Sequence, residues 1–423
     1  MALSTHLVMS LIDLAMIGTL GNRAVGAAGL ASFSYALVLA VVGGLAPAVQ
    51  GITARRRGEG STEPKCLPLN GGLLLSVVIG LPLTVICWFV TPFFFRLISS
   101  DPQVTATGIP YLQVLYLSII ATGMHRAFQG YWSGIEKPKI YMAIVFAMVL
   151  MNVGVNYALI FGNLGFPALG ATGAAIGTVV ALYAGLLVNF GIAWVQYRHE
   201  GFLKAKPEPA LLKRIFRISI PPAMQQFFFS AGYVVYLWLV GQVGTAELAA
   251  ANVLVRISLV LLILATAVGM ASATLVSRTL GEGDHEGAAQ WGWDSAKLGV
   301  IGISLLALPV FLFPKYFLAI FLTDPNAIAI ALVPMRLVAA TAGLGSLIYI
   351  FAYTLYSVGD GNRVTMISFG TQWLFFLPAV WFVGPHLNYG LLEISFVQVA
   401  YGAIATMLVT SLWAGGKWKG ARA

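Results

Sequence analysis

Charged residues are scarce in this sequence. Aspartate, glutamate, lysine and arginine make up 9% of its 423 residues, 59% are hydrophobic, and the mean hydropathy is +0.87. Soluble domains carry roughly a quarter of their residues as these four charged types, so an ordinary soluble protein is excluded. Segments of alternating polarity are absent as well, which favours membrane-spanning helices over strands.

The signatures of several enzyme classes are also missing. The five histidines are scattered, and the sequence has no HExxH zinc motif, no Ser-His-Asp grouping and no Walker A loop. The two cysteines, Cys66 in a basic loop and Cys87 inside an apolar run, do not form a disulfide framework. We therefore expect no enzyme, no cofactor and no direct use of ATP. The net charge of +9 sits in short loops rather than in one stripe, so we expect no nucleic-acid partner.

Apolar runs separated by Gly, Pro and charged clusters predict an all-α membrane protein with 12 transmembrane helices, each needing about 20 apolar residues. The predicted spans are 2–20, 29–53, 69–96, 105–133, 139–161, 170–196, 219–241, 250–276, 293–320, 327–356, 364–383 and 391–414. These spans predict an N-terminal six-helix lobe over 1–196, a cytoplasmic linker over 197–217 and a C-terminal six-helix lobe over 218–423.

The two halves repeat each other. Ser100-Asp101-Pro102 aligns with Thr323-Asp324-Pro325, and Arg55-x-x-Gly58-Glu59-Gly60 aligns with Arg278-x-x-Gly281-Glu282-Gly283 at the same offset. A constant offset indicates duplication. Because each half has an even number of spans, both insert in the same orientation, and we expect a pseudo-two-fold axis along the membrane normal. The two aspartates, each followed by proline, are predicted to cap helices.

The same offset aligns Met1 with Met224, although the second half begins earlier, with the basic stretch Leu211 to Ile220. From span length we expect the native chain to extend roughly 10 to 20 residues before Met1.

Basic residues define the topology, because loops rich in Lys and Arg stay in the cytoplasm. One side of the predicted membrane has only Arg23, Arg96 and Lys315. The other collects Arg55, Arg56, Arg57, Lys65, Lys137, Lys139, Arg198, Lys204, Lys206, Lys213, Arg214, Arg217, Arg278, Arg363, Lys417, Lys419 and Arg422. We therefore expect a multi-pass protein of a bacterial or archaeal cytoplasmic membrane, with both termini in the cytoplasm.

Several motifs resemble the multidrug and toxic compound extrusion (MATE) family. They are Ile12-Asp13-x-x-Met16-Ile17-Gly18-x-Leu20-Gly21, Asn152-x-x-x-Asn156, Gly170-x-x-Gly173-Ala174-Ala175-Ile176-Gly177-Thr178 and Gly241-x-x-Gly244-Thr245. The resemblance implies a V-shaped transporter with two lobes around a central cavity, which works by alternating access. It implies export of small, amphipathic, often cationic drug-like compounds in exchange for protons or sodium ions. We expect a monomer whose partners are these compounds and membrane lipids.

Asp13 is the one acidic residue that the predicted spans place well inside the membrane, roughly 10 Å deep at 1.5 Å per residue. A carboxylate there costs at least about 2 to 3 kcal/mol to insert, so we expect it to face a cavity or a partner. A carboxyl that takes up a proton on one side and releases it on the other would serve coupling; the alternative is a purely structural hydrogen-bonded carboxyl. His6, Ser10 and Asp13 follow i, i+4, i+7 spacing and predict a relay on one helical face, unless His6 is merely solvated.

Asn152 and Asn156 lie one helical turn apart, so their amides point to one side of their helix. They are candidates to hydrogen-bond Asp13 or to hold Na⁺ together with it; the alternative is packing between helices. No other metal site is expected. In the family, some members have an acidic residue at the second of these positions, where this chain has Asn156.

The second half is predicted to hold the substrate cavity. Phe227, Phe228, Phe229 and Ser230 fill the region where some family members have a glutamate, so no sodium site is expected there. Candidate substrate contacts are Gln225, Gln226, Tyr233, Tyr236, Tyr349 and Tyr353, because amides and aromatic faces suit flat amphipathic ligands. The alternative for the tyrosines is an interfacial belt or core packing.

Two other functions remain open from sequence. A flippase for lipid-linked saccharides would need cationic side chains converging on a pyrophosphate, and the basic residues within spans, Arg126, Arg256, Lys297 and Arg336, do not obviously converge. A channel would share the duplication and the polar cavities, and substrate-dependent proton counterflow would distinguish it.

Overall fold

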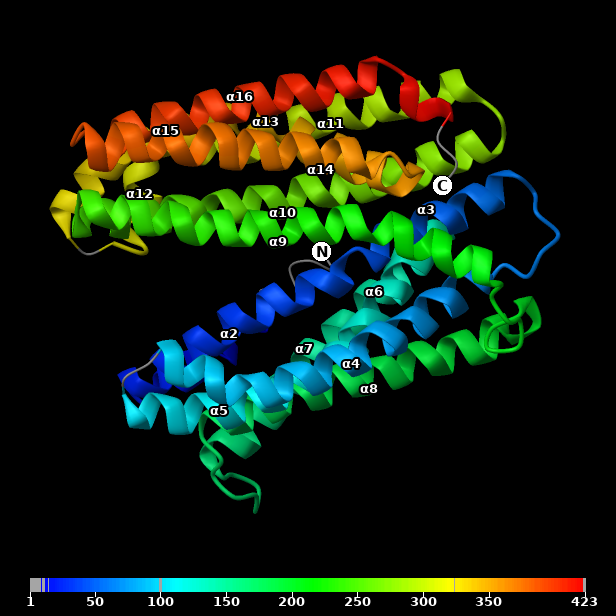
Figure 1. Ribbon diagram of the computed structural model, residues 1–423, viewed down its shortest axis with the longest axis horizontal. Helices are drawn as coiled ribbons and strands as arrows, with labels where there is room; N and C mark the ends of the chain where they lie inside the picture. Colours follow the sequence, from blue (N-terminus) through cyan, green and yellow to red (C-terminus); the bar gives the residue numbers. More distant parts are fainter. Residues whose placement is uncertain (1–8, 10–11, 14, 99–100, 323, 421–423) are drawn as a thin grey trace. The chain divides into compact units, whose positions relative to one another are not determined.

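The computed structural model describes residues 9, 12–13, 15–98, 101–322 and 324–420. Every regular element in this part of the chain is helical (Figure 1). The chain divides into two compact units. The first unit comprises residues 1–57 and 61–223, and the second comprises 58–60 and 224–423.

The first unit is built from long helices that pack in pairs. Its elements are α2 (Asn22–Gly43), α3 (Leu45–Gly58), α4 (Leu67–Ile98), α5 (Pro102–Tyr116), α6 (Ile119–Gly134), α7 (Pro138–Phe161), α8 (Ala171–Tyr197) and the 3₁₀ turn η1 (Arg198–Glu200). The pairs α7 with α8, α4 with α6, and α2 with α5 make the most extensive contacts. The α7–α8 pair also supplies the two side chains that donate hydrogen bonds to Asp13.

The second unit is organised around α13 (Pro325–Val358), which packs against α10 (Thr245–Gly281), α11 (His285–Leu312) and α16 (Leu391–Ala414). Its other elements are most of α9 (Pro209–Val243), α12 (Pro314–Ala319), α14 (Gly361–Phe369), the π-helix η2 (Gly370–Phe376), α15 (Leu377–Trp381), the π-helix η3 (Phe382–His386) and η4 (Lys417–Gly420). Apolar side chains from these helices, among them Val240, Ala331, Met335 and Val380, form a buried core.

The helical membrane fold predicted from the sequence is confirmed. Among the described residues, ten helices are long and apolar enough to cross a membrane, or eleven if the bent pair α5–α6 counts as one span. Every predicted span from 29–53 onward coincides with one of them. The predicted first span, 2–20, lies largely outside the described residues. The predicted helix caps are also confirmed, since Asp101 accepts the Gln103 backbone N–H at 2.8 Å and Asp324 accepts that of Asn326 at 3.0 Å.

The span predicted over 105–133 is formed by two helices, α5 and α6. The chain bends by 42° between α5 and α6. Carbonyls at the bend accept hydrogen bonds from side chains of other helices: Tyr183 Oη donates to the Leu117 carbonyl at 2.9 Å, and Thr84 Oγ1 donates to that of Tyr116 at 3.2 Å. A broken helix inside a membrane is tolerated when other helices satisfy the freed backbone groups in this way.

Two other predicted spans differ in detail from the structure. The span predicted over 293–320 ends at Leu312, because Pro314 starts the separate short helix α12 and restricts the residue before it. The span predicted over 364–383 contains π-helical turns. The stretch 197–217 includes the first turns of α9, where Leu211 and Ile215 are buried one helical turn apart.

Candidate functional site

Asp13 lies in a polar cluster inside the first unit, with 6% of its surface exposed. Its carboxylate accepts two hydrogen bonds: Asn156 Nδ2 of α7 donates to Oδ1 at 2.5 Å, and Thr178 Oγ1 of α8 donates to Oδ2 at 2.7 Å. Asn152 joins the cluster, since its Nδ2 lies 3.3 Å from Thr178 Oγ1 and its Oδ1 lies 3.4 Å from Asn156 Nδ2. Three helical segments thus bring four polar side chains together within an apolar bundle.

The α7–α8 pair sets this geometry. Asn152 and Asn156 are fully buried one turn apart on α7, as the sequence spacing predicted. Gly177 faces Asn156 from α8, and its missing side chain leaves the space that the Asn156 amide occupies. Asn156 Oδ1 is buried and has no hydrogen-bond partner among the described residues. One acceptor is therefore left over beside a carboxylate that already has two donors.

This arrangement can hold the carboxyl in two protonation states. As a carboxylate, Asp13 is an acceptor only, and the amide N–H of Asn156 and the hydroxyl of Thr178 satisfy it. As a neutral acid, Asp13 gains one O–H donor and needs an acceptor, which a rotated Thr178 hydroxyl or Asn156 Oδ1 can provide. Exchange between the two states needs side-chain rotations within the cluster and no new residue.

The predicted residues of this site lie as follows. Asp13, Asn152 and Asn156 lie in contact in one cluster. His6 and Ser10 lie outside the described residues. Thr178 was missed as a site residue, although the sequence offered a signal, since it follows Gly177 inside a motif already singled out. Among the described residues, no group of three or more His, Cys, Asp or Glu could hold a metal ion.

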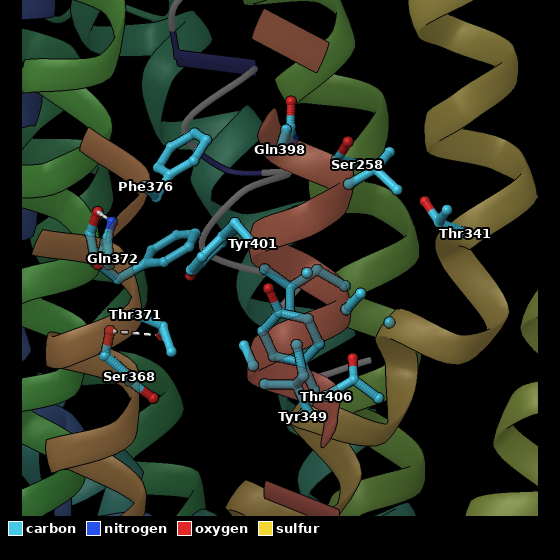
Figure 2. A pocket seen from close by; sticks show the side chains of 18 of the residues that line it. Ser258, Thr341, Tyr349, Ser368, Thr371, Gln372, Phe376, Gln398, Tyr401 and Thr406 are labelled. Atoms are coloured by element: carbon cyan, nitrogen blue, oxygen red, sulfur yellow. Dashed lines mark hydrogen bonds between the residues drawn. The ribbon is translucent and has the colours of Figure 1, made fainter. Parts of the chain in front are cut away.

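The second unit contains a cavity of about 600 Å³ between α9, α10, α13, η2 and α16, shown from close by in Figure 2. Gln225, Tyr233, Tyr236 and Tyr349, all predicted substrate contacts, line it. Gln226 does not line it; its amide lies 3.5 Å from Ser230 Oγ on the same helix. Tyr353 is also absent from the lining and lies against Gly269 of α10.

Several lining residues were not predicted. The α16 side chains Gln398, Tyr401 and Thr406 and the η2 side chain Gln372 line the cavity (Figure 2). Gly232 of α9 makes room for Gln372, because a Cβ at this glycine would overlap the Gln372 amide. Polar side chains inside a predicted membrane span were the available signal for α16. No sequence signal indicated the π-helical turns that place Gln372, because their pattern of apolar residues resembles that of an α-helix.

Comparison with known proteins places the chain in a family. The family model MatE matches residues 1–158 and 221–382, which is most of the chain. The chain belongs to the MatE family. This confirms the resemblance to MATE efflux transporters. The MatE protein is similar to the probable multidrug resistance protein NorM of Neisseria meningitidis serogroup B, with 26% identity over 329 residues covering 76% of this chain and 71% of that protein. It is also 23% identical to the probable NorM of Thermotoga maritima over 429 residues, covering 98% of this chain and 89% of that protein.

Solved structures agree with the fold of this MatE protein. The Vibrio cholerae MATE transporter VcmN in its bent form superposes with a TM-score of 0.86 at 18% identity, covering 99% of this chain and 95% of that one. A MOP superfamily transporter from Pyrococcus furiosus superposes with a TM-score of 0.88 at 16% identity, covering 98% of this chain and 92% of that one. These likenesses support an all-helical membrane fold of two lobes.

Proposed function

We propose that this MatE protein exports small amphipathic, drug-like compounds across a bacterial or archaeal cytoplasmic membrane in exchange for protons. In this proposal the lobes 1–196 and 218–423 alternate between inward-open and outward-open states, the linker 197–217 and both termini face the cytoplasm, and a monomer is sufficient. The names of the NorM relatives support drug-like substrates. The coupling step is argued from the first unit.

The observation that carries the proposal is the pair of hydrogen bonds that Asp13 accepts from Asn156 and Thr178 inside the first unit. The two donors stabilise the charged form at a depth where an isolated carboxylate is costly. Burial disfavours that same charged form. A carboxyl held between opposing effects changes protonation when its exposure to water changes, and alternating access supplies such a change.

Sodium is the alternative coupling ion. Oxygen atoms of Asp13, Asn152, Asn156 and Thr178 are the hard ligands that such a cation prefers, and Asn156 Oδ1 is unpaired among the described residues. The carboxylate charge is already compensated by the hydrogen bonds from Asn156 and Thr178, however, and the same cluster accommodates the neutral acid without a cation. We therefore favour the proton.

The flippase alternative is less well supported. A pyrophosphate headgroup requires Lys or Arg at the binding site. The cavity of the second unit has no Lys, Arg or His among its lining residues. The cavity therefore favours ligands without a concentrated negative charge.

The test is transport into inverted membrane vesicles, with a pH gradient and a sodium gradient imposed separately. Two probes are followed, uncharged radiolabelled chloramphenicol and cationic ethidium. We expect the pH gradient alone to drive uptake of at least one probe, and Asp13→Asn to abolish that uptake, because the amide keeps the shape of the carboxyl but does not titrate. Binding of the probes to the purified variant should persist.

The matched control is Asp294→Asn, which removes a carboxylate from an exposed ion pair with Lys297 in the second unit and should transport normally. Normal uptake by Asp13→Asn at about pH 6, 7 and 8 would refute the coupling role of Asp13. Uptake driven by the sodium gradient alone would replace the proton with sodium.

A further inference from the structure

The cavity of the second unit has no Asp, Glu, Lys, Arg or His side chain among the described residues that line it. Its polar groups are hydroxyls and amides, and the remaining wall is aliphatic and aromatic. A charged ligand that enters such a cavity loses its hydration and finds no counter-ion, which is costly even when the walls are aromatic.

Four polar side chains of the lining are free to bind a ligand. Tyr349 of α13 and Gln398, Tyr401 and Thr406 of α16 line the cavity, and their side chains have no hydrogen-bond partner among the described residues (Figure 2). In contrast, Ser258 and Thr341 donate to carbonyls of their own helices, at 2.9 and 2.8 Å. The four side chains are half-buried at the cavity wall, so their polar groups are accessible to a guest molecule.

An aromatic wall stands beside these groups. Tyr236 stacks on Phe376 with ring centroids 5.5 Å apart, and Phe376 contacts Tyr401 at 4.8 Å. The cavity volume of about 600 Å³ suits a drug-sized molecule. Flat ring systems gain from contact with such a wall, while the free hydroxyls and the Gln398 amide bond their polar edges.

The cavity also reaches apolar surface of the spans. Leu344 of α13 and Met407 of α16 line it, and they are 62% and 72% exposed. Both belong to helices that are long and apolar enough to span a membrane. An apolar, uncharged rim of this kind favours a neutral molecule over an ion, because an ion loses more hydration there.

We propose that the cavity of the second unit binds uncharged, flat amphipathic molecules. The two units then have different roles: the first holds the titratable group, and the second holds a neutral substrate. This inference rests on the proposed export function and names the substrate class of its cavity. Tyr349, Gln398, Tyr401 and Thr406 bond the polar edge of the ligand, and the Tyr236–Phe376–Tyr401 wall stacks on its face.

The test compares two probes of nearly equal shape, uncharged acridone and cationic N-methylacridinium. Binding to the purified full chain in detergent is measured by equilibrium dialysis. We expect acridone to bind about tenfold more tightly than N-methylacridinium. Tyr401→Phe removes a hydroxyl group, and Thr406→Val replaces one with a methyl group of similar size. Each variant should weaken acridone binding severalfold.

A charge-introducing variant makes the test specific to this cavity. Gln398→Glu places a carboxylate in the lining, and we expect it to strengthen N-methylacridinium binding about tenfold and to weaken acridone binding. Gln226→Glu adds the same charge to a neighbouring position outside the lining and should change neither affinity. Equal or tighter binding of the cation by the unaltered chain, or no effect of Gln398→Glu in a folded variant, overturns the inference.

The outcomes separate this inference from the proposed function. Asp13→Asn lies in the other unit and should keep full acridone binding. If Asp13→Asn transports normally while the charge preference of the cavity holds, the coupling proposal fails and the neutral cavity stands. If Asp13→Asn loses transport while Gln398→Glu has no effect on binding, the coupling proposal stands and the neutral cavity is refuted.

Discussion

Gly177 of α8 and Asn156 of α7 fit each other in the first unit: a Cβ on the glycine would overlap Asn156 Oδ1. The Asn156 amide occupies this space while its Nδ2 donates to Asp13. Helix packing and the hydrogen bonding of the buried carboxylate are therefore coupled through one glycine.

We expect Gly177→Ala to displace the Asn156 amide and to lower gradient-driven export about tenfold or more, because overpacking a tight contact costs about 1–3 kcal/mol. The measurement is the initial rate of uptake in inverted vesicles, beside the thermal stability of the purified variant. Gly191→Ala is the control on the same helix, since nothing lies within 4 Å of a Cβ at that position. Equal export by the two variants would show that the position of Asn156 is unimportant.

The second donor to Asp13 can be removed without changing shape. Thr178→Val replaces the hydroxyl by a methyl group and leaves one carboxylate oxygen without its donor. Hydrogen bonds to charged groups contribute about 1.5–3 kcal/mol, so we expect export to fall by about tenfold or more. Thr178→Ser keeps the hydroxyl and should retain most activity. Matching export by Val and Ser variants over the same pH range would exclude a role for this hydroxyl.

Local chemistry explains which parts of the site could be read from the sequence. Asp13 stands out because a carboxylate in a span is costly, and Asn152 and Asn156 follow from helical periodicity. Thr178 lies within a motif that the sequence singled out, but its contact with Asp13 depends on how α7 packs on α8, which the sequence does not indicate. The contact of Asp13 with both α7 and α8 depends on tertiary packing, which helical periodicity alone does not predict.

In the fold too, features set by local sequence could be predicted and features set by contacts between helices could not. Span positions follow from hydropathy, and the caps Asp101 and Asp324 follow from Asp-Pro pairs. The break near Ser118 did not follow, because it depends on Tyr183 and Thr84 of other helices reaching the freed carbonyls. In the second unit, the Gln372 position depends on π-helical turns that have no distinct apolar period.

Cys66 gives a prediction that depends on pH. The thiol is fully buried just before α4, with Sγ 3.2 Å from Tyr131 Oη, and burial raises its pKa from 9.0 to about 11. Because thiolate is the reactive form, we expect almost no labelling of folded protein by iodoacetamide near pH 8, and faster labelling as pH rises toward 11. The contribution of this thiol to stability is fully present below pH 9.0 and is lost as pH rises through about 11.

Mass spectrometry of a Cys87→Ser variant isolates the Cys66 signal. Denatured protein, in which the thiol is exposed, is the control and should label rapidly at the same pH. Rapid labelling of the folded chain near pH 8 would contradict the buried environment.

A buried hydrogen bond between α6 and α8 should be important for stability. Trp132 Nε1 donates to Asn189 Oδ1 at 2.9 Å, and both residues are fully buried. Asn189→Leu would leave the indole N–H unsatisfied and should lower the free energy of unfolding by about 1–3 kcal/mol. The double variant Trp132→Phe/Asn189→Leu removes both partners and should lose less than the sum of its single variants. Thermal unfolding in one detergent measures all three, and strict additivity would mean that the bond contributes nothing.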